Sequence, residues 1–243
     1  MHKTLSNLQL PQNISLNILN NQNFFQELKT ILEGDPYLWL LVDKNNPLPS
    51  NYAPSDLVRL KKATYDLSLQ EINLRRIAIA DLEEMTAVAK KEGVNLLVTS
   101  AYRSYSYQIQ VFEQYVKKNG YDNTFLISAR PGTSQHQLGL TIDFESYLNF
   151  EKYKQGLIND DNHAIIFSQT PEGKWLADNA SLYGWSMSYP KGYEEATGYN
   201  WESWHYRYVG KALSLFIDTY FEGVQQYALE FIDYYTKQIS AIN

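Results

Sequence analysis

The sequence predicts an α+β protein in which one main domain carries helical extensions at its two ends. Segments with helical periodicity alternate along the chain with short strand-like segments, without an internal repeat or a low-complexity linker. A length of 243 residues is enough to bury a substantial core. Hydrophobic residues make up 44% and charged residues 20% of the chain, as in ordinary globular proteins.

Apolar spacing and helix-terminating residues predict the helices. Gly120 is typical of the residue that ends a helix, and Pro171 is typical of a first turn, with Gly184 closing the same segment. We expect Gly223 to break the C-terminal helical region. The predicted helices are residues 24–32, 69–91, 105–119, 171–184 and 211–239.

The predicted strands are short. Residues 138–144 alternate apolar with polar side chains, which is typical of a half-buried strand. Residues 1–23 are rich in Asn, Gln and Leu, and we interpret them as an ordered or semi-ordered extension. The other predicted strands are residues 38–42, 95–100 and 204–209.

Composition excludes several classes of protein. The net charge of -6 and the pI of about 5.3 argue against nucleic-acid binding as the main activity, because such proteins concentrate Lys and Arg. The absence of cysteine excludes disulfides and Cys-ligated zinc. The apolar runs are too short to span a bilayer, and residues 1–12 lack the apolar core of a signal peptide.

Two of the four histidines lie in short runs that also contain carboxylates. Residues 134–143 read SQHQLGLTID and contain His136 and Asp143. Residues 201–210 read WESWHYRYVG and contain His205. Two imidazoles and one carboxylate form a ligand set that catalytic zinc prefers, since three protein ligands leave one position for water.

The spacing within the first run constrains the local structure. An odd separation on one regular strand would put His136 and Asp143 on opposite faces. We therefore expect His136 to lie in the loop before the strand, with Gly139 easing the entry. Spacing alone does not establish that the two runs meet.

These runs resemble the VanY-type D-alanyl-D-alanine carboxypeptidase family, part of the LAS group of zinc metallopeptidases (lysostaphin, D-Ala-D-Ala peptidases, hedgehog). The matching patterns are S-x-H-x-x-G-x-x-x-D and E-x-W-H-x-R-Y-V-G. Three further stretches fit the same family in its order, so the resemblance runs from about residue 39 to residue 210. They are residues 41–49 (LVDKNNPLP), 52–58 (YAPSDLV) and 100–104 (SAYRS).

The resemblance implies a fold and a division of the chain. The implied fold is a small antiparallel sheet flanked by helices, of the hedgehog and DD-peptidase kind. Residues 1–38 would then be an N-terminal extension. Residues 39–243 would be a zinc carboxypeptidase domain that includes the C-terminal helices.

The resemblance also implies that His136, Asp143 and His205 bind one Zn2+. A base must take a proton from the attacking water and deliver it to the leaving amine, and Glu202 is our candidate. A regular strand would point positions 202 and 205 apart, so we expect the backbone to turn near Ser203 and Trp204. The alternative for Glu202 is a surface carboxylate.

The remaining candidate residues would hold the substrate. A carboxypeptidase must recognise a free carboxylate, which the Arg guanidinium binds as a two-pronged fork, and the resemblance implies this role for Arg103. Gln108 and Ser134 match positions that help to hold the peptide end, but a solvated helix residue and a turn residue are equally good interpretations. Trp204 would line the pocket or simply pack in the core. We interpret His163, which has no motif around it, as a surface residue.

The leading hypothesis is a zinc-dependent carboxypeptidase that removes the terminal D-alanine from peptidoglycan stem peptides, with D,D or L,D specificity. One alternative is a zinc endopeptidase that cuts the peptidoglycan cross-bridge, and Arg103 argues against it. A less favoured alternative is a non-catalytic zinc-stabilised binding module, and Glu202 argues against that because a structural site needs no base. The resemblance implies a peptidoglycan stem peptide as the partner and the bacterial cell envelope or the extracellular space as the location.

Overall fold

A mixed sheet lies at the centre of the molecule. The computed structural model describes residues 8–61, 66–67 and 71–241. Within these residues five strands form a sheet in the order β2-β4-β5-β7-β6, and all neighbours are antiparallel except β2 and β4. The strands are β2 (Asp66–Leu67), β4 (Leu97–Ser100), β5 (Thr141–Glu145), β6 (Trp185–Met187) and β7 (His205–Tyr208). A separate antiparallel pair joins β1 (Leu57–Arg59) to β3 (Asn73–Arg75). The α+β class is confirmed.

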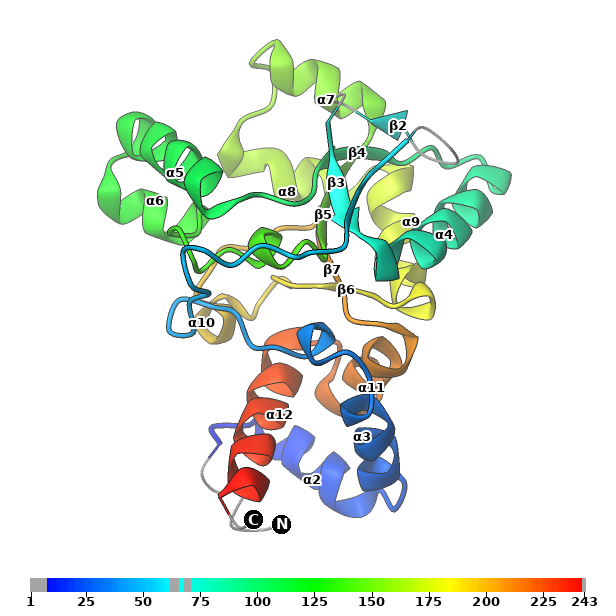
Figure 1. Cartoon of the computed structure of the whole chain (residues 1–243). Helices are drawn as coiled ribbons and strands as arrows, with labels where there is room; N and C mark the ends of the chain where they lie inside the picture. Colours follow the sequence, from blue (N-terminus) through cyan, green and yellow to red (C-terminus); the bar gives the residue numbers. More distant parts are fainter. Residues whose placement is uncertain (1–7, 62–65, 68–70, 242–243) are drawn as a thin grey trace.

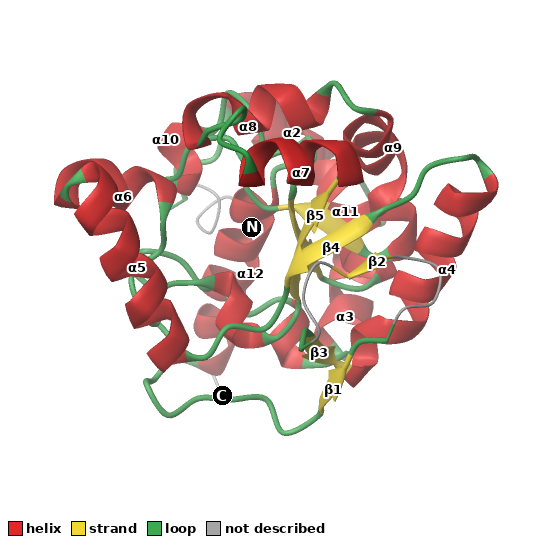
Figure 2. Cartoon of the chain, turned by 90° about the horizontal axis from the view of Figure 1, so that it is seen from above, coloured by secondary structure: helices red, strands yellow, loops and turns green. Residues whose placement is uncertain are grey.

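Helices surround this sheet. Figures 1 and 2 show α5 and α6 at one side of the molecule and α4 and α9 at the other, with the sheet between them. Figure 1 also shows α7 above the sheet and α8 beside it. Their bounds are α4 (Ile79–Lys91), α5 (Tyr105–Asn119), α6 (Tyr121–Ile127), α7 (Tyr147–Lys154), α8 (Asp160–Ser168), α9 (Pro171–Asn179) and a short α10 (Glu194–Thr197).

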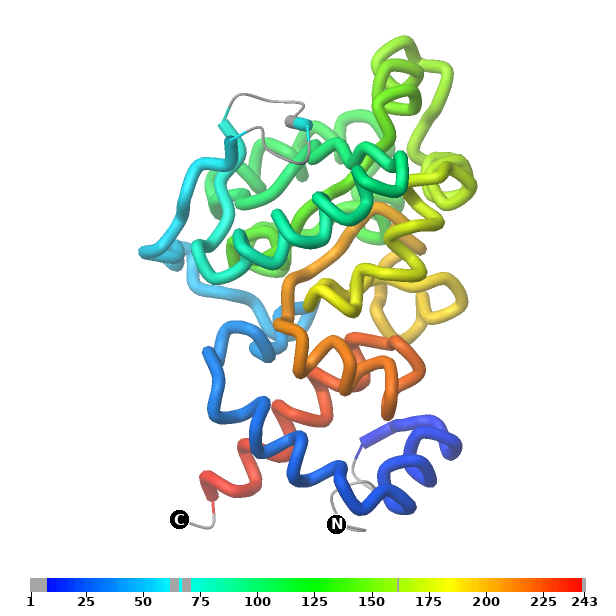
Figure 3. Tube along the Cα trace, turned by 90° about the vertical axis from the view of Figure 1, so that its right-hand side faces the viewer, coloured from blue at the N-terminus to red at the C-terminus, as the bar shows by residue number. Residues whose placement is uncertain are grey.

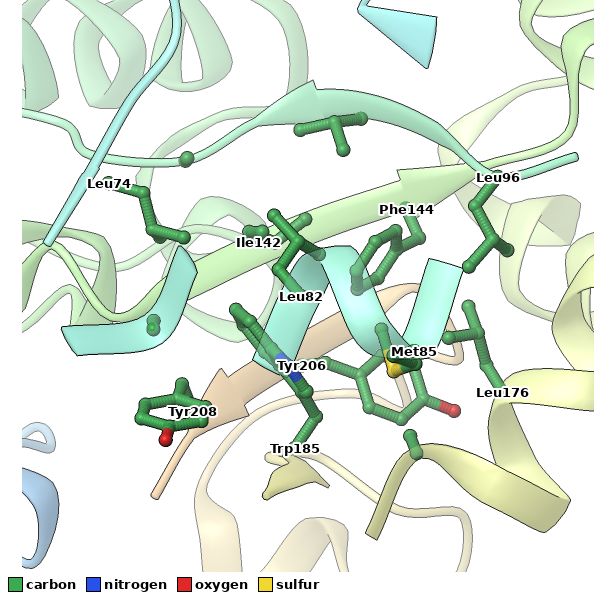
Figure 4. Packing of buried hydrophobic residues seen from close by; sticks show 14 of the residues in the cluster. Leu74, Leu82, Met85, Leu96, Ile142, Phe144, Leu176, Trp185, Tyr206 and Tyr208 are labelled. Carbon is green, nitrogen blue, oxygen red and sulfur yellow. The ribbon is translucent and has the colours of Figure 1, made fainter. Parts of the chain in front are cut away.

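The main core lies on one face of the sheet. Leu82 and Met85 of α4 and Leu176 of α9 point at the aromatic and aliphatic side chains of the strands (Figure 4). Ile142 and Phe144 of β5 reach this core because alternate residues of a strand share one face. The intervening Asp143 is thereby left for the opposite face, which carries the candidate site.

Four helices from the two ends of the chain form a second core. They are α2 (Gln12–Asn20), α3 (Phe24–Leu32), α11 (Lys211–Phe221) and α12 (Gln225–Ser240). Figure 3 shows them as a bundle below the sheet. Phe24 is fully buried among aromatic rings, with ring centroids 4.9 Å from Phe216, 5.0 Å from Tyr220 and 5.3 Å from Phe231. The division of the chain after residue 38 stays a prediction.

Several predicted helices are confirmed. The helices over residues 24–32 and 105–119 have the expected bounds. The helix predicted over residues 171–184 begins at Pro171, continues after α9 as a 3₁₀ turn, and ends at Gly184 in a left-handed conformation. The C-terminal region breaks at Gly223, as expected, into α11 and α12.

Two predicted elements are wrong. Residues 38–42 form no strand, because the carbonyls of Tyr37, Leu38 and Leu40 accept hydrogen bonds from the Arg207 guanidinium instead of a neighbouring strand. The helix predicted over residues 69–91 begins only at Ile79. Residues 73–75 are β3, a 3₁₀ turn over residues 76–78 follows it, and residues 68–70 lie outside the described part.

Candidate active site

The β5–β7 pairing brings the two sequence runs together. Asp143 of β5 lies opposite His205 of β7 in the antiparallel register. His136 lies in the 3₁₀ turn Gln135–Leu138 just before β5, and Gly139 follows this turn with a φ of 68°. One ligand atom from each of His136, Asp143 and His205 lies within 4.8 Å of the other two. The expectation that His136 precedes the strand is confirmed.

The His136 ring is oriented by a backbone hydrogen bond. Its Nδ1 lies 2.6 Å from the Ala101 carbonyl oxygen, which can only accept, so Nδ1 carries the hydrogen. Nε2 therefore presents a lone pair to Asp143 Oδ1 at 3.3 Å. Both atoms are buried acceptors without a hydrogen-bond partner. Two buried acceptors facing each other fit a site for a cation.

His205 stands between two carboxylates. Its Nδ1 lies 3.3 Å from Asp143 Oδ1 and 3.1 Å from Glu202 Oε2. Glu202 reaches this position because the chain turns at residues 203–204, where the His205 amide donates to the Glu202 carbonyl. The turn expected near Ser203 and Trp204 is confirmed, and it brings the candidate base beside the candidate ligands.

The electrostatics of the site fit a bound cation. Burial lowers the pKa of His136 to about 4, and Arg103 acts in the same direction. Burial alone would raise the pKa of Asp143, but His136 and His205 hold it well below its usual range. Burial alone would lower the pKa of His205, yet its contacts with Asp143 and Glu202 raise it. A metal ion would replace the proton that these carboxylates attract to His205.

The three ligand candidates open into a pocket of about 540 Å³. Arg103 enters it from the loop between β4 and α5. Its Nη2 lies 3.4 Å from Asp143 Oδ2, and its Nη1 donates to Gln108 Oε1 at 3.2 Å. The Arg103 backbone amide donates to the His136 carbonyl at 3.2 Å. The guanidinium is thus fixed beside the candidate metal site.

The other candidate substrate residues also line this pocket, but they differ in their contacts. Gln108 is buried and uses both ends of its amide within the protein, accepting from Arg103 and donating to the Ala129 carbonyl at 2.7 Å. The geometry therefore favours orientation of Arg103 over a direct contact with substrate. Ser134 and Trp204 lie at the pocket wall.

The interpretation of His163 as a surface residue is wrong. Its side chain is 17% exposed, and its Nε2 contacts the buried Glu145 carboxylate. Its ring stacks on Trp204 with centroids 4.1 Å apart. Glu145 follows Asp143 by two residues, so both side chains lie on the same face of β5. This spacing was the one signal in the sequence that a second carboxylate on that face needed a partner, which is His163.

Tyr189 also lines the pocket. Its buried ring lies 4.7 Å from the His205 ring and 4.9 Å from the Tyr199 ring, centroid to centroid. Burial raises the pKa of Tyr189 well above its ordinary value, so the phenol stays neutral. It forms an uncharged wall beside the candidate ligands.

Fold and site together define a metal-binding hydrolase of the peptidase class. The sequence model of the VanY family, described as D-alanyl-D-alanine carboxypeptidase, matches residues 71–211. The putative carboxypeptidase YodJ of Bacillus subtilis is 36% identical over 217 residues, which is 84% of this chain and 76% of the relative. A D-alanyl-D-alanine carboxypeptidase of Enterococcus faecalis is 31% identical over 73% of this chain and 61% of its own length. The chain belongs to the VanY family of carboxypeptidases.

Solved structures agree with this assignment. The LD-carboxypeptidase LdcB has a TM-score of 0.61 and 37% identity, and the match covers 76% of this chain and 85% of that one. The D,D-pentapeptidase VanY of a VanB-type resistance cassette, solved in complex with Zn(II), has a TM-score of 0.61 and 26% identity, over 79% and 98% of the two chains. This chain shares their fold.

Proposed function

We propose that this protein is a zinc carboxypeptidase that removes the terminal D-alanine from peptidoglycan stem peptides. The observation that carries the proposal is the buried face-to-face contact of His136 Nε2 with Asp143 Oδ1, beside His205 Nδ1 and at the base of a pocket that contains Arg103. Relatives described as D-alanyl-D-alanine carboxypeptidases support the substrate class.

His136, Asp143 and His205 would hold the zinc ion as two neutral imidazoles and one carboxylate. A zinc ion held by these residues would lower the pKa of a bound water molecule toward about 7 and would polarise the scissile carbonyl. Three protein ligands leave the fourth position for this chemistry, which distinguishes a catalytic from a structural zinc site.

Glu202 is the proposed general base. Its Oε2 lies 3.1 Å from His205 Nδ1, and Glu202 lines the same pocket as the three ligands. A carboxylate at this place can take a proton from the attacking water and then give it to the leaving amine. The position of Glu202 supports an enzyme over a zinc-stabilised binding module.

Arg103 is the proposed anchor of the substrate carboxylate. Gln108 Oε1 accepts from Nη1 at 3.2 Å and Asp143 Oδ2 lies 3.4 Å from Nη2, so these two contacts fix the guanidinium at the pocket. Each Nη carries two hydrogens, so a terminal carboxylate can bind the hydrogens that these two contacts leave. A charged anchor at the pocket favours release of one terminal residue over cleavage inside a cross-bridge.

The proposal includes both D,D and L,D specificity, because the relatives have either one. LdcB is described as an LD-carboxypeptidase and has the higher identity to this chain, whereas VanY is described as a D,D-pentapeptidase.

A peptidoglycan substrate would place the protein in the cell envelope or outside the cell. Among the described residues, none of the helices combines the length and the apolar character needed to cross a bilayer.

Zinc content tests the ligand set. We expect wild type to bind one zinc ion per chain and His136→Ala to lose it, because no other part of the described chain groups ligands in this way. His163→Gln is the matched control, since His163 lies outside the ligand set, and it should retain zinc. Elemental analysis that finds undiminished zinc in His136→Ala would contradict the assignment.

A further inference from the structure

Helix α12 begins with two buried glutamines that have hydrogen-bond partners outside the helical bundle. Gln225 is 1% and Gln226 is 6% exposed. The other buried side chains of α12 are apolar and pack in the bundle core, as Leu229, Phe231 and Ile232 do. A buried amide is costly unless its polar atoms are hydrogen-bonded, so the partners of these two side chains show what they hold in place.

Gln225 contacts residues next to the candidate metal ligands. Its Oε1 accepts from Gln135 Nε2 at 3.2 Å, and its Nε2 donates to the Ser186 carbonyl of β6 at 3.2 Å. Gln135 directly precedes His136 in the chain. Ser188 completes the cluster, because its hydroxyl donates to Gln135 Oε1 at 2.7 Å and its amide donates to the His205 carbonyl at 3.1 Å. The cluster therefore contacts the His205 backbone directly and holds the side chain of Gln135, the residue that precedes His136.

Gln226 holds a different part of the pocket. Its Nε2 donates to Asp43 Oδ2 at 2.9 Å and to Glu230 Oε1 of the same helix at 2.7 Å. Asp43 Oδ1 accepts from the backbone amides of Asn45 and Asn46. Lys44, which lies between Asp43 and Asn45 in the chain, donates from Nζ to the Phe125 carbonyl at 2.6 Å and to the Gly198 carbonyl.

Lys44 brings this loop to the pocket wall. Its Nζ lies 4.4 Å from the centre of the Tyr199 ring, which lines the pocket and packs against Tyr189. Residues 41–49 matched the family pattern, but they contribute no residue to the proposed chemistry. Their contacts give them a role in shaping the pocket, with Gln226 as the anchor.

We propose that Gln225 and Gln226 are positioning residues of the active site, so that the bundle α2–α3–α11–α12 is part of the catalytic unit. Gln225 positions the two histidine ligands, and Gln226 positions the pocket wall. Both residues lie beyond residue 211, where the VanY family match ends. The part of this inference that concerns turnover rests on the proposed function, whereas the part that concerns metal binding does not.

The two roles predict different defects. Methionine matches glutamine in length but makes no comparable hydrogen bond. Gln225→Met should weaken zinc binding or kcat by roughly 10- to 100-fold, as for other residues that support metal ligands, and should change KM little. Gln226→Met should raise KM by about 5- to 10-fold, because the one hydrogen bond that holds Asp43 is lost, and should leave zinc affinity unchanged. Gln238→Met, at an exposed position of the same helix, is the control and should behave as wild type.

Zinc affinity is measured by competition with a chromophoric chelator, and kcat and KM are measured on a defined stem peptide with the zinc-loaded protein. A Gln225→Met protein that unfolds cooperatively but keeps wild-type zinc affinity and kcat would overturn the role of Gln225. A wild-type KM for Gln226→Met would overturn the role of Gln226.

A second variant covers the case in which Gln225→Met does not fold. Ser188→Ala leaves α12 intact and removes one hydrogen bond of the same cluster, so zinc affinity or kcat should again fall, and wild-type values would overturn the proposal. If wild type binds zinc but cleaves no stem peptide, the proposed function fails, while the zinc affinities of these variants still decide the role of Gln225.

Discussion

One backbone hydrogen bond decides which nitrogen of His136 faces the metal site. The Ala101 carbonyl takes the hydrogen of Nδ1, and Nε2 is left with its lone pair toward Asp143. His205 has the reverse arrangement, with Nδ1 toward Asp143 and Glu202. The Ala101 carbonyl, which orients His136, lies outside the two sequence runs. Asp143 and Glu202 lie within the runs, but the runs alone do not show that these two residues contact His205.

Removing the carboxylate of Glu202 should abolish turnover without removing the metal. Glu202→Gln keeps the shape of the side chain but cannot accept a proton, so we expect kcat to fall by roughly 10²- to 10⁴-fold with zinc content unchanged. Steady-state kinetics and elemental analysis measure the two quantities. Glu195→Gln, at an exposed position of α10, is the control. A near wild-type kcat for Glu202→Gln between about pH 6 and 8 would exclude Glu202 as the base.

Arg103→Lys separates the geometry of the guanidinium from its charge. Lysine keeps the positive charge but loses the two-pronged fork and the contact with Gln108. We expect kcat/KM to fall roughly 10- to 100-fold, which corresponds to about 1.5–3 kcal/mol for a hydrogen bond to a charged group. The exposed Arg76→Lys should have no effect. Unchanged kcat/KM in Arg103→Lys would remove Arg103 from substrate recognition.

The sequence predicted which residues to examine better than it predicted their contacts. It identified His136, Asp143, His205 and Glu202, and the structure brings all four together. It did not predict that the Gln108 amide is hydrogen-bonded to Arg103 and to the Ala129 carbonyl. The bond to Ala129 depends on the course of the chain after α6.

At the scale of elements, strand register controls the site. Both β5 and β7 were predicted from their own residues, but the pairing of Asp143 with His205 depends on contacts between segments far apart in the chain. The error at residues 69–91 has a local cause. Ile72 and Leu74 fit a helical pattern with the residues that follow, yet they also alternate as a strand does, and here β3 pairs with β1.

Gly139 links the His136 turn to β5, and we expect it to tolerate no side chain. Its φ is 68°, a conformation that costs an ordinary residue about 1–2 kcal/mol. A Cβ there would also lie 2.9 Å from Leu57 Cδ2 and 3.1 Å from Pro54 Cγ. Gly192 has a φ of 86° and nothing within 4 Å of its Cβ position, so Gly192→Ala reports the backbone cost alone.

Thermal unfolding of the two glycine variants separates these effects. Gly192→Ala should lower Tm by roughly 2–8 °C, because about 1 kcal/mol corresponds to about 2–4 °C in a chain of this size. Gly139→Ala should lower Tm further and should weaken zinc binding, because the turn must move. Equal Tm values for the two variants would show that the contacts around Gly139 adjust freely.

At the scale of the whole molecule, two cores cooperate. The sheet core supports the site, and the bundle joins both ends of the chain through Phe24 and its aromatic neighbours. The sequence predicted the helices over residues 24–32 and 211–239 but not their packing on each other, since local periodicity carries no information on such distant contacts. The same limit applies to Gln225 and Gln226. They are far from the motifs in sequence, so local patterns did not predict their contacts with Gln135 and Asp43.

Mass spectrometry of defined stem peptides tests the central proposal most directly. Tetrapeptide and pentapeptide stems, each with a free or an amidated C-terminus, are incubated with the zinc-loaded protein, with and without chelator. We predict loss of one terminal D-alanine from at least one free-carboxylate stem, little or no cleavage of the amidated forms, and loss of activity with chelator that zinc restores. Equal cleavage of free and amidated peptides would contradict a carboxypeptidase and favour an endopeptidase. No cleavage of any stem by the zinc-loaded protein would contradict the proposed activity altogether.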